Sequence, residues 1–247
     1  MTIARRKLIV ALDFGTFGDA LALARQVSDL VGLFKINVQL FTAEGPDAVR
    51  KLAKLGVGVF LDLKYHDIPN TVAGAVAAAG RLPGVELLNI HATGGLEMMR
   101  AAARALAASQ VPGPRPKLLG VTILTSMDRE ALKQVGISGS PRARVVSLAR
   151  LSKRAGLDGV VASPQEVTQI RRACGRDFLT VIPGVRPAPS EKTPRRRDDQ
   201  ARVATPGDAI RAGADYLVVG RPITAAPDPR AAAQAIVEEI SSAMDRG

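Results

Sequence analysis

The segment VGVFLDLKYHDIPNT, residues 57–71, joins an apolar run to a dense group of charged residues. Residues 57–65 have the branched and aromatic composition of a β-strand, in which successive side chains point to opposite faces. That alternation places Asp62 and Lys64 on one face, with their Cα atoms about 6.5 Å apart. Asp67 follows just beyond the strand. Opposed charges at the carboxyl end of a strand indicate a sheet whose strand ends carry a functional site.

Seven further strand-like runs repeat along the chain, separated by Ala-rich stretches with helical periodicity. They are residues 7–14, 33–41, 86–92, 118–126, 158–164, 178–185 and 216–224. This order is typical of parallel βα units. Eight such units in 247 residues predict an α/β protein with a (β/α)8 TIM barrel fold, with a doubly wound open sheet as the alternative. Because no Gly/Ser linker divides residues 1–247, we expect a single domain.

The composition is that of a globular protein, since 47% of the residues are hydrophobic. No apolar run approaches the ~20 residues that cross a membrane, and Asp13 interrupts the opening apolar stretch, unlike a signal peptide. We therefore expect a cytoplasmic protein with no membrane partner. The single cysteine, Cys174, excludes a disulfide within the chain and a cysteine-based metal cluster. We expect it to be an ordinary residue near a helix end.

The net charge of +11 suits nucleic acid, a membrane surface or small anionic ligands, and its sign alone does not choose between them. Only 3% of the residues are aromatic and there is no Trp, so the stacking platforms of single-strand binders are hard to assemble. Much of the excess is arginine in helical stretches, which is typical of a solvated surface. We therefore expect no nucleic-acid partner.

The second run, residues 33–41, has two contrasting faces. Its apolar face carries Phe34, Ile36, Val38 and Leu40, and its polar face carries Lys35, Asn37 and Gln39. We expect the apolar face to meet helices and the polar face to point inward. Lys35 and Asp13 would then lie with Asp62 and Lys64 at one end of the barrel, where the dielectric constant is low. Burying charges there is costly unless they are paired. Such charges are useful if a reaction develops charge in its transition state. A structural ion pair at the rim is the alternative for Asp62 and Lys64 alone.

Further polar residues follow other strands, at the end where barrels place their active sites. They are His91, Thr125, Ser126, Arg186 and Arg221. In GADYLVVGRPIT, residues 213–224, we expect Arg221 to lie within the last strand. There it would bind a phosphate in bidentate fashion, next to the Gly220 N–H. The segment at about 186–206 is rich in proline and charge, which predicts a phosphate-binding lid. Within it we single out Arg186 and Gln200, and expect Arg195–Arg197 to be solvated.

In these motifs the chain resembles the orotidine 5′-phosphate decarboxylase family. The resemblance runs nearly end to end through ALDF, FKIN, DLKYHDIPNT, NIHATGG, VTILTSM, GVVASPQE, IPGVRP and VVGRPIT, and DLKYHDIPNT is its most specific part. It implies a carbon–carbon lyase that converts orotidine 5′-monophosphate to uridine 5′-monophosphate, the last step of de novo pyrimidine nucleotide synthesis. It also implies that the reaction uses neither a cofactor nor a metal.

The resemblance further implies a role for each candidate residue. Lys64 would stabilise and protonate the carbanion at C6, and Asp62 would lie near the departing carboxylate. Lys35 and Asp67 would complete an alternating charge network, with Asp67 supplied by the second subunit of a homodimer. Substrate binding would fall to Asp13 and Lys35 at the ribose, Asn70 and Thr71 at the ribose or phosphate, Thr125 and Ser126 at the pyrimidine, and Arg186, Gln200, Gly220 and Arg221 at the phosphate. His66 and His91 would be structural, because the mechanism needs a permanent cation.

Two other functions compete with this interpretation. Hexulose-phosphate synthase shares the Asp-x-Lys-x-x-Asp pattern but uses Mg²⁺, and the carboxylates available for a metal shell here are few. A non-catalytic binder of nucleotides or nucleic acid could use the +11 charge without turnover. The presence of Asp62, Lys64 and Asp67 together argues against such a binder.

Overall fold

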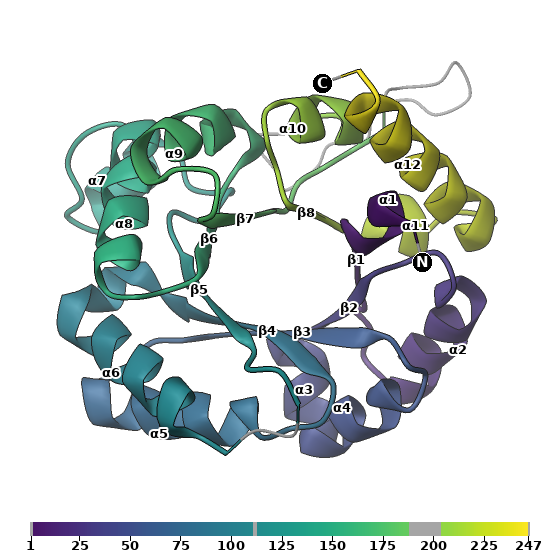
Figure 1. Cartoon of the computed structure of the whole chain (residues 1–247), viewed down its shortest axis with the longest axis horizontal. Coiled ribbons are helices and arrows are strands. Elements are labelled where there is room, and N and C mark those ends of the chain that lie inside the picture. Colours follow the sequence, from purple (N-terminus) through teal and green to yellow (C-terminus); the bar gives the residue numbers. More distant parts are fainter. Residues whose placement is uncertain (1, 111–112, 188–203, 247) are drawn as a thin grey trace.

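Eight parallel strands close into one barrel in the computed structural model, which describes residues 2–110, 113–187 and 204–246 (Figure 1). The strands are β1 Leu8–Ala11, β2 Leu33–Asn37, β3 Gly58–Tyr65, β4 Val85–His91, β5 Lys117–Val121, β6 Gly159–Val161, β7 Leu179–Ile182 and β8 Tyr216–Val219. Each strand pairs with its successor in the sequence, and β8 pairs with β1. The predicted TIM barrel is therefore confirmed, and the open sheet is excluded because the ring closes.

The helices form an outer ring around the strands (Figure 1). They are α1 Ile3–Arg6, α2 Phe17–Val27, α3 Val38–Glu44, α4 Pro46–Ala53, α5 Pro69–Gly80, α6 Gly95–Ala108, α7 Arg129–Gln134, α8 Pro141–Arg154, α9 Val167–Cys174, α10 Pro206–Arg211, α11 Arg221–Thr224 and α12 Pro229–Met244, with short 3-10 turns η1 Ala92–Gly94 and η2 Pro164–Glu166. Local sequence signals begin many of them. Thr16 caps α2 and Asp228 caps α12, each accepting a bond from a first-turn N–H. None of the described helices is long and apolar enough to cross a membrane.

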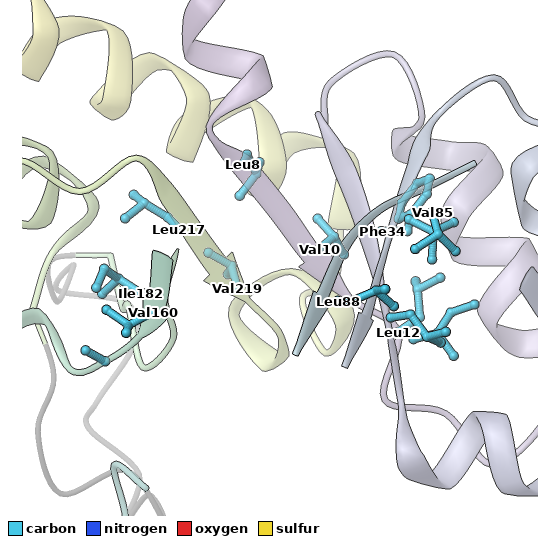
Figure 2. Packing of buried hydrophobic residues seen from close by; sticks show 14 of the residues in the cluster. Leu8, Val10, Leu12, Phe34, Val85, Leu88, Val160, Ile182, Leu217 and Val219 are labelled. Carbon is cyan, nitrogen blue, oxygen red and sulfur yellow. The ribbon is translucent and has the colours of Figure 1, made fainter. Parts of the chain in front are cut away.

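Apolar side chains pack in two layers, one on each face of the barrel wall. Outward-facing side chains of the strands meet the helices, and Figure 2 shows part of this layer, including Leu8 and Val10 of β1 and Leu217 of β8. The inner layer fills the barrel with Ile9, Ala11, Leu33, Phe60, Leu87, Leu119, Val181 and Val218. The alternation along β1 follows directly from the two-residue period of a strand. The packed inner layer gives the polar mouth of the barrel a solid floor.

The second strand ends earlier than the sequence predicts. β2 stops at Asn37, whose side-chain oxygen accepts a bond of 2.9 Å from the Leu40 N–H and so caps α3. The expected burial of Phe34, Ile36 and Leu40 is confirmed. The expected positions of Val38 and Gln39 are wrong, because both lie in α3 and are exposed.

The last strand is also shorter than predicted. β8 ends at Val219, and Arg221 is the first residue of α11 rather than part of the strand. Pro222 explains the change, because it has no N–H for a strand ladder but is tolerated in the first turn of a helix. Cys174 is the last residue of α9 and is buried, and burial raises the pKa of its thiol. It is an ordinary helix-end residue, as expected.

Candidate active site

A cavity of about 370 Å³ opens at the carboxyl ends of the strands. Its floor includes Phe60 and Val218 of the inner layer. Nine of the residues predicted from the sequence line it: Asp13, Lys35, Asp62, Lys64, Thr125, Ser126, Arg186, Gly220 and Arg221. They come from six different strands or the segments that follow them, so only closure of the barrel brings them together.

Four charges alternate along one wall of this cavity. The Lys35 Nζ lies 2.8 Å from Asp13 Oδ1 and 3.4 Å from Asp62 Oδ2, and the Lys64 Nζ lies 2.6 Å from Asp62 Oδ1. The two central side chains, Lys35 and Asp62, are only 9% and 10% exposed. Charges this deeply buried are stable only when paired and hydrogen-bonded. Lys64 is 32% exposed, so the end of the row is accessible to a ligand.

An irregularity of β3 sets the position of Lys64. Leu61 pairs with Leu88 of β4 and Tyr65 pairs with Ile90, so three residues of β3 lie opposite one residue of β4. Lys64 has φ of 52° and is the one non-glycine residue with positive φ among those the structure describes. Such bulges and left-handed residues concentrate at functional sites. The predicted meeting of Asp62 and Lys64 is confirmed, although simple alternation does not account for it.

Asn89 is a site residue that the sequence analysis did not single out. Its Nδ2 donates to Asp62 Oδ1 at 2.6 Å, and its Oδ1 accepts from the Lys64 backbone N–H at 2.8 Å. The side chain is fully buried. The sequence did contain a signal for it. Asn89 lies two residues after the inward-facing Leu87, so the alternation of a strand points the polar Asn89 side chain into the barrel as well.

Asp67, Asn70 and Thr71 lie outside the cavity. All three are exposed, and Asp67 Oδ1 accepts a bond of 2.6 Å from the Ile68 N–H. Asp67 forms no ion pair with another residue in the described part of the chain. Asn70 and Thr71 lie in the first turn of α5. One copy of the chain therefore does not bring these three predicted residues to the charged row.

Three of the predicted phosphate-binding residues follow β7 and β8, next to the β1 end of the charged row. Arg186 follows β7, and its backbone N–H donates to the Ala204 carbonyl at 3.0 Å, so the two ends of the predicted lid lie side by side. Gly220 lies close to the charged row, because a Cβ built on it would be 3.8 Å from Asp13 Oδ2. Arg221 lines the same space. Gln200 and Arg195–Arg197 lie outside the described residues.

The two histidines form a pair beside the cavity. The ring centroids of His66 and His91 are 5.3 Å apart, and neither residue is among those lining the cavity. Burial lowers the pKa of His91, the neighbouring His66 and Lys64 lower it further, and Asp62 opposes the shift. His91 is half-buried, and the lowered pKa disfavours the charged form of its ring, which is consistent with the expected structural role.

A second cavity, of about 500 Å³, lies at the opposite end of the barrel and is also lined by basic residues. Two of them, Arg171 and Lys7, donate hydrogen bonds within the chain. Arg171 donates to the carbonyls of Gly213 and Phe178 and to the Asp215 carboxylate, and Lys7 donates to the Ala214 and Asp215 carbonyls. These bonds link the ends of neighbouring strands. This end of the barrel is stabilising, and the mouth beside Lys64 is the candidate active site.

Within the described residues, no group of three or more His, Cys, Asp or Glu side chains could hold a metal ion.

Comparison with known proteins shows the family of the chain. The model of the family described as "Orotidine 5'-phosphate decarboxylase / HUMPS family" matches residues 6–236. The chain belongs to the orotidine 5′-phosphate decarboxylase family. Among curated members, the orotidine 5′-phosphate decarboxylase of Geobacter sulfurreducens is 55% identical over 237 residues, covering 96% of this chain and 97% of that protein. The one of Geotalea uraniireducens is 54% identical and covers 96% of both.

Two solved structures share the fold. The orotidine 5′-phosphate decarboxylase of Lactobacillus acidophilus superposes with a TM-score of 0.82 at 38% identity, covering 95% of this chain and 99% of that one. An uncharacterized conserved protein from Geobacillus kaustophilus gives 0.80 at 37% identity, covering 94% and 99%.

Proposed function

We propose that the row Asp13, Lys35, Asp62 and Lys64 carries out the reaction of this enzyme. The chain is an orotidine 5′-phosphate decarboxylase, a carbon–carbon lyase that replaces the C6 carboxylate of orotidine 5′-monophosphate with a proton in pyrimidine biosynthesis. The difficulty lies in the electron pair left on C6, which occupies the ring plane and cannot delocalise into the carbonyls. The protein must therefore supply fixed charge beside that carbon.

Lys64 supplies the cation in this proposal. Its ammonium group lies at one of the two accessible ends of the row, 2.6 Å from Asp62 Oδ1. An ammonium close to C6 stabilises the carbanion electrostatically and then delivers the proton that replaces CO₂. The single observation that carries the assignment is that this ammonium group extends from a buried, paired row into the ligand cavity.

Asp62 supplies negative charge beside the carboxylate that leaves. Its two oxygens meet three donors, the Lys64 and Lys35 ammonium groups and the Asn89 amide, which hold the carboxylate in one orientation. Repulsion between Asp62 and the substrate carboxylate is relieved as CO₂ departs, which favours the transition state over the ground state.

The remaining residues bind the parts of the substrate that do not react. We assign Asp13 and Lys35 to the ribose hydroxyls, Thr125 and Ser126 to the pyrimidine, and Arg186, Gln200, Gly220 and Arg221 to the phosphate. The lid at about 186–206 would close over that phosphate. Because the phosphate does not react, its binding energy serves to close the lid and to order the charged row around the ring.

We also propose a homodimer with composite sites. The segment 66–71 is exposed throughout, and Ile68 within it is 67% exposed. A second copy covering this segment would bury Ile68 and bring Asp67 next to Lys64 of its partner, continuing the alternation of charge. Asn70 and Thr71 would reach the same site.

Subunit mixing tests the composite site. Lys64→Ala and Asp67→Ala are each expected to be inactive alone. A symmetric dimer reassembled from equal amounts would regain activity at about a quarter of its sites, because a mixed dimer has one intact and one doubly defective site. No regain on mixing, with exchange verified by a tagged subunit, would place Asp67 outside the partner's site.

Turnover is tested directly by following the loss of orotidine 5′-monophosphate absorbance with a chelator present. We expect full activity in the chelator and near-complete loss in Lys64→Ala with the fold retained. Near-normal turnover by Lys64→Ala would refute the catalytic assignment. We place the enzyme in the cytoplasm, without a membrane or nucleic-acid partner, and nucleic-acid binding that falls steeply with salt would contradict the last point.

A further inference from the structure

The Asn89 amide closes a ring of hydrogen bonds around Lys64. The Lys64 backbone N–H donates to Asn89 Oδ1, Asn89 Nδ2 donates to Asp62 Oδ1, and the Lys64 ammonium group donates to the same Asp62 oxygen. The three distances are 2.8, 2.6 and 2.6 Å. The ring therefore joins the backbone of Lys64 to its own charged end through two other side chains.

The ring holds a backbone conformation that a lysine rarely adopts. Lys64 has φ of 52° within a bulge where residues 62–64 lie opposite Asn89 alone. In a bulge the regular ladder is interrupted, and its extra residues need other hydrogen-bond partners. The Asn89 oxygen supplies one for Lys64. A strained conformation persists only where its surroundings over-determine it, and this buried amide is one such constraint.

We propose that Asn89 is a positioning residue, which fixes the Lys64 ammonium group and the Asp62 carboxylate relative to each other and to the substrate ring. The inference rests on the proposed roles of Lys64 and Asp62. The amide offers a donor and an acceptor on one rigid planar group, and Asn89 uses one of each here. The backbone N–H of Lys64 and the carboxylate of Asp62 also determine which way the amide points.

Two replacements of similar size separate the functions of the amide. Asn89→Leu removes both hydrogen bonds. Asn89→Asp keeps an acceptor for the Lys64 N–H but sets a second carboxylate against Asp62, which would displace one of them. We expect each to lower kcat on the order of 100-fold, because a misplacement of about 1 Å has that effect on a preorganised site.

Affinity for the product separates positioning from general damage. Uridine 5′-monophosphate is held mainly by its phosphate and ribose, so its Kd should stay within about threefold in both variants. The matched control is Thr180→Val in β7. Thr180 is also fully buried, and its hydroxyl contacts Arg171 and Asp215 at the other end of the barrel. We expect this control to lower Tm while kcat stays within about threefold.

The decisive measurement is therefore kcat and product Kd in the wild type, Asn89→Leu, Asn89→Asp and Thr180→Val. If Asn89→Leu does not fold, Asn89→Ser replaces it. The inference is overturned by a kcat within about threefold of the wild type in folded Asn89 variants, by an equal loss of product affinity, or by an equal kcat loss in Thr180→Val. Near-normal turnover by Lys64→Ala would instead overturn the proposed function, on which this inference rests.

Discussion

Replacing Lys64 by glycine and by alanine separates the backbone strain at this residue from its chemistry. Both changes remove the ammonium group and its bond to Asp62, so the two variants differ only in how readily residue 64 adopts φ of 52°. A left-handed conformation costs an alanine about 1–2 kcal/mol and costs a glycine almost nothing. Glycine also loses more conformational entropy on folding than alanine does, which reduces the advantage of the Lys64→Gly variant by about 0.5–1 kcal/mol.

At the midpoints of these ranges, the Lys64→Gly variant is about 0.75 kcal/mol more stable than Lys64→Ala. In a chain of this size that corresponds to a Tm higher by roughly 1.5–3 °C. At an ordinary helical position the order is reversed. Arg104, exposed in the middle of α6, provides the control, and Arg104→Gly should be about 1 kcal/mol less stable than Arg104→Ala.

Thermal and urea unfolding of the four variants would measure the stability difference between glycine and alanine at position 64 and at position 104. Turnover of orotidine 5′-monophosphate would be followed in parallel. Both Lys64 variants should be almost inactive, since neither retains the cation. If Lys64→Gly were less stable than Lys64→Ala by as much as the Arg104 pair, residue 64 would not be strained. The account of the bulge would then be wrong.

Three further predictions concern the charged row, the phosphate and the histidine pair. Lys35→Met should lower stability by about 3 kcal/mol, or roughly 6–12 °C in Tm, because it removes one of the two cations that compensate the buried Asp62 carboxylate. Asp62 would keep its bonds to Lys64 and Asn89, and an unchanged Tm would contradict the prediction. Arg221→Ala should raise KM by roughly 10- to 100-fold for the phosphorylated substrate and leave the slow turnover of orotidine itself unaltered; equal losses for both would show that Arg221 does not bind phosphate. Because burial lowers the pKa of His91, the unfolded chain takes up a proton at a higher pH than the folded protein, so stability should fall on acidification below about pH 6.5. Chemical unfolding between pH 7.5 and 5.5 should show a weaker fall in His91→Gln, and equal slopes would exclude His91 as the cause.

Much of this protein could be predicted from local patterns. The two-residue period of the strands and the intervening helices predict the barrel, because each βα unit must bury one apolar face. The same period identifies Lys35 and Asp62 as polar side chains pointing into the barrel, and Asp13, Arg186 and Gly220 follow strands at the end where sites form. These inferences succeed because they depend only on residues that are neighbours in the sequence.

Only the tertiary structure shows the features that depend on contacts between residues far apart in the sequence. The φ of Lys64 and the role of Asn89 arise from the register between β3 and β4, whose bonded residues are 25 and 27 positions apart in the sequence. Asp67 follows Lys64 by only three residues in the sequence, yet Asp67 is exposed in the folded chain. Alternation specifies which face a side chain takes, whereas pairing register, bulges and burial are set by the strand alongside, and no local pattern contains that information.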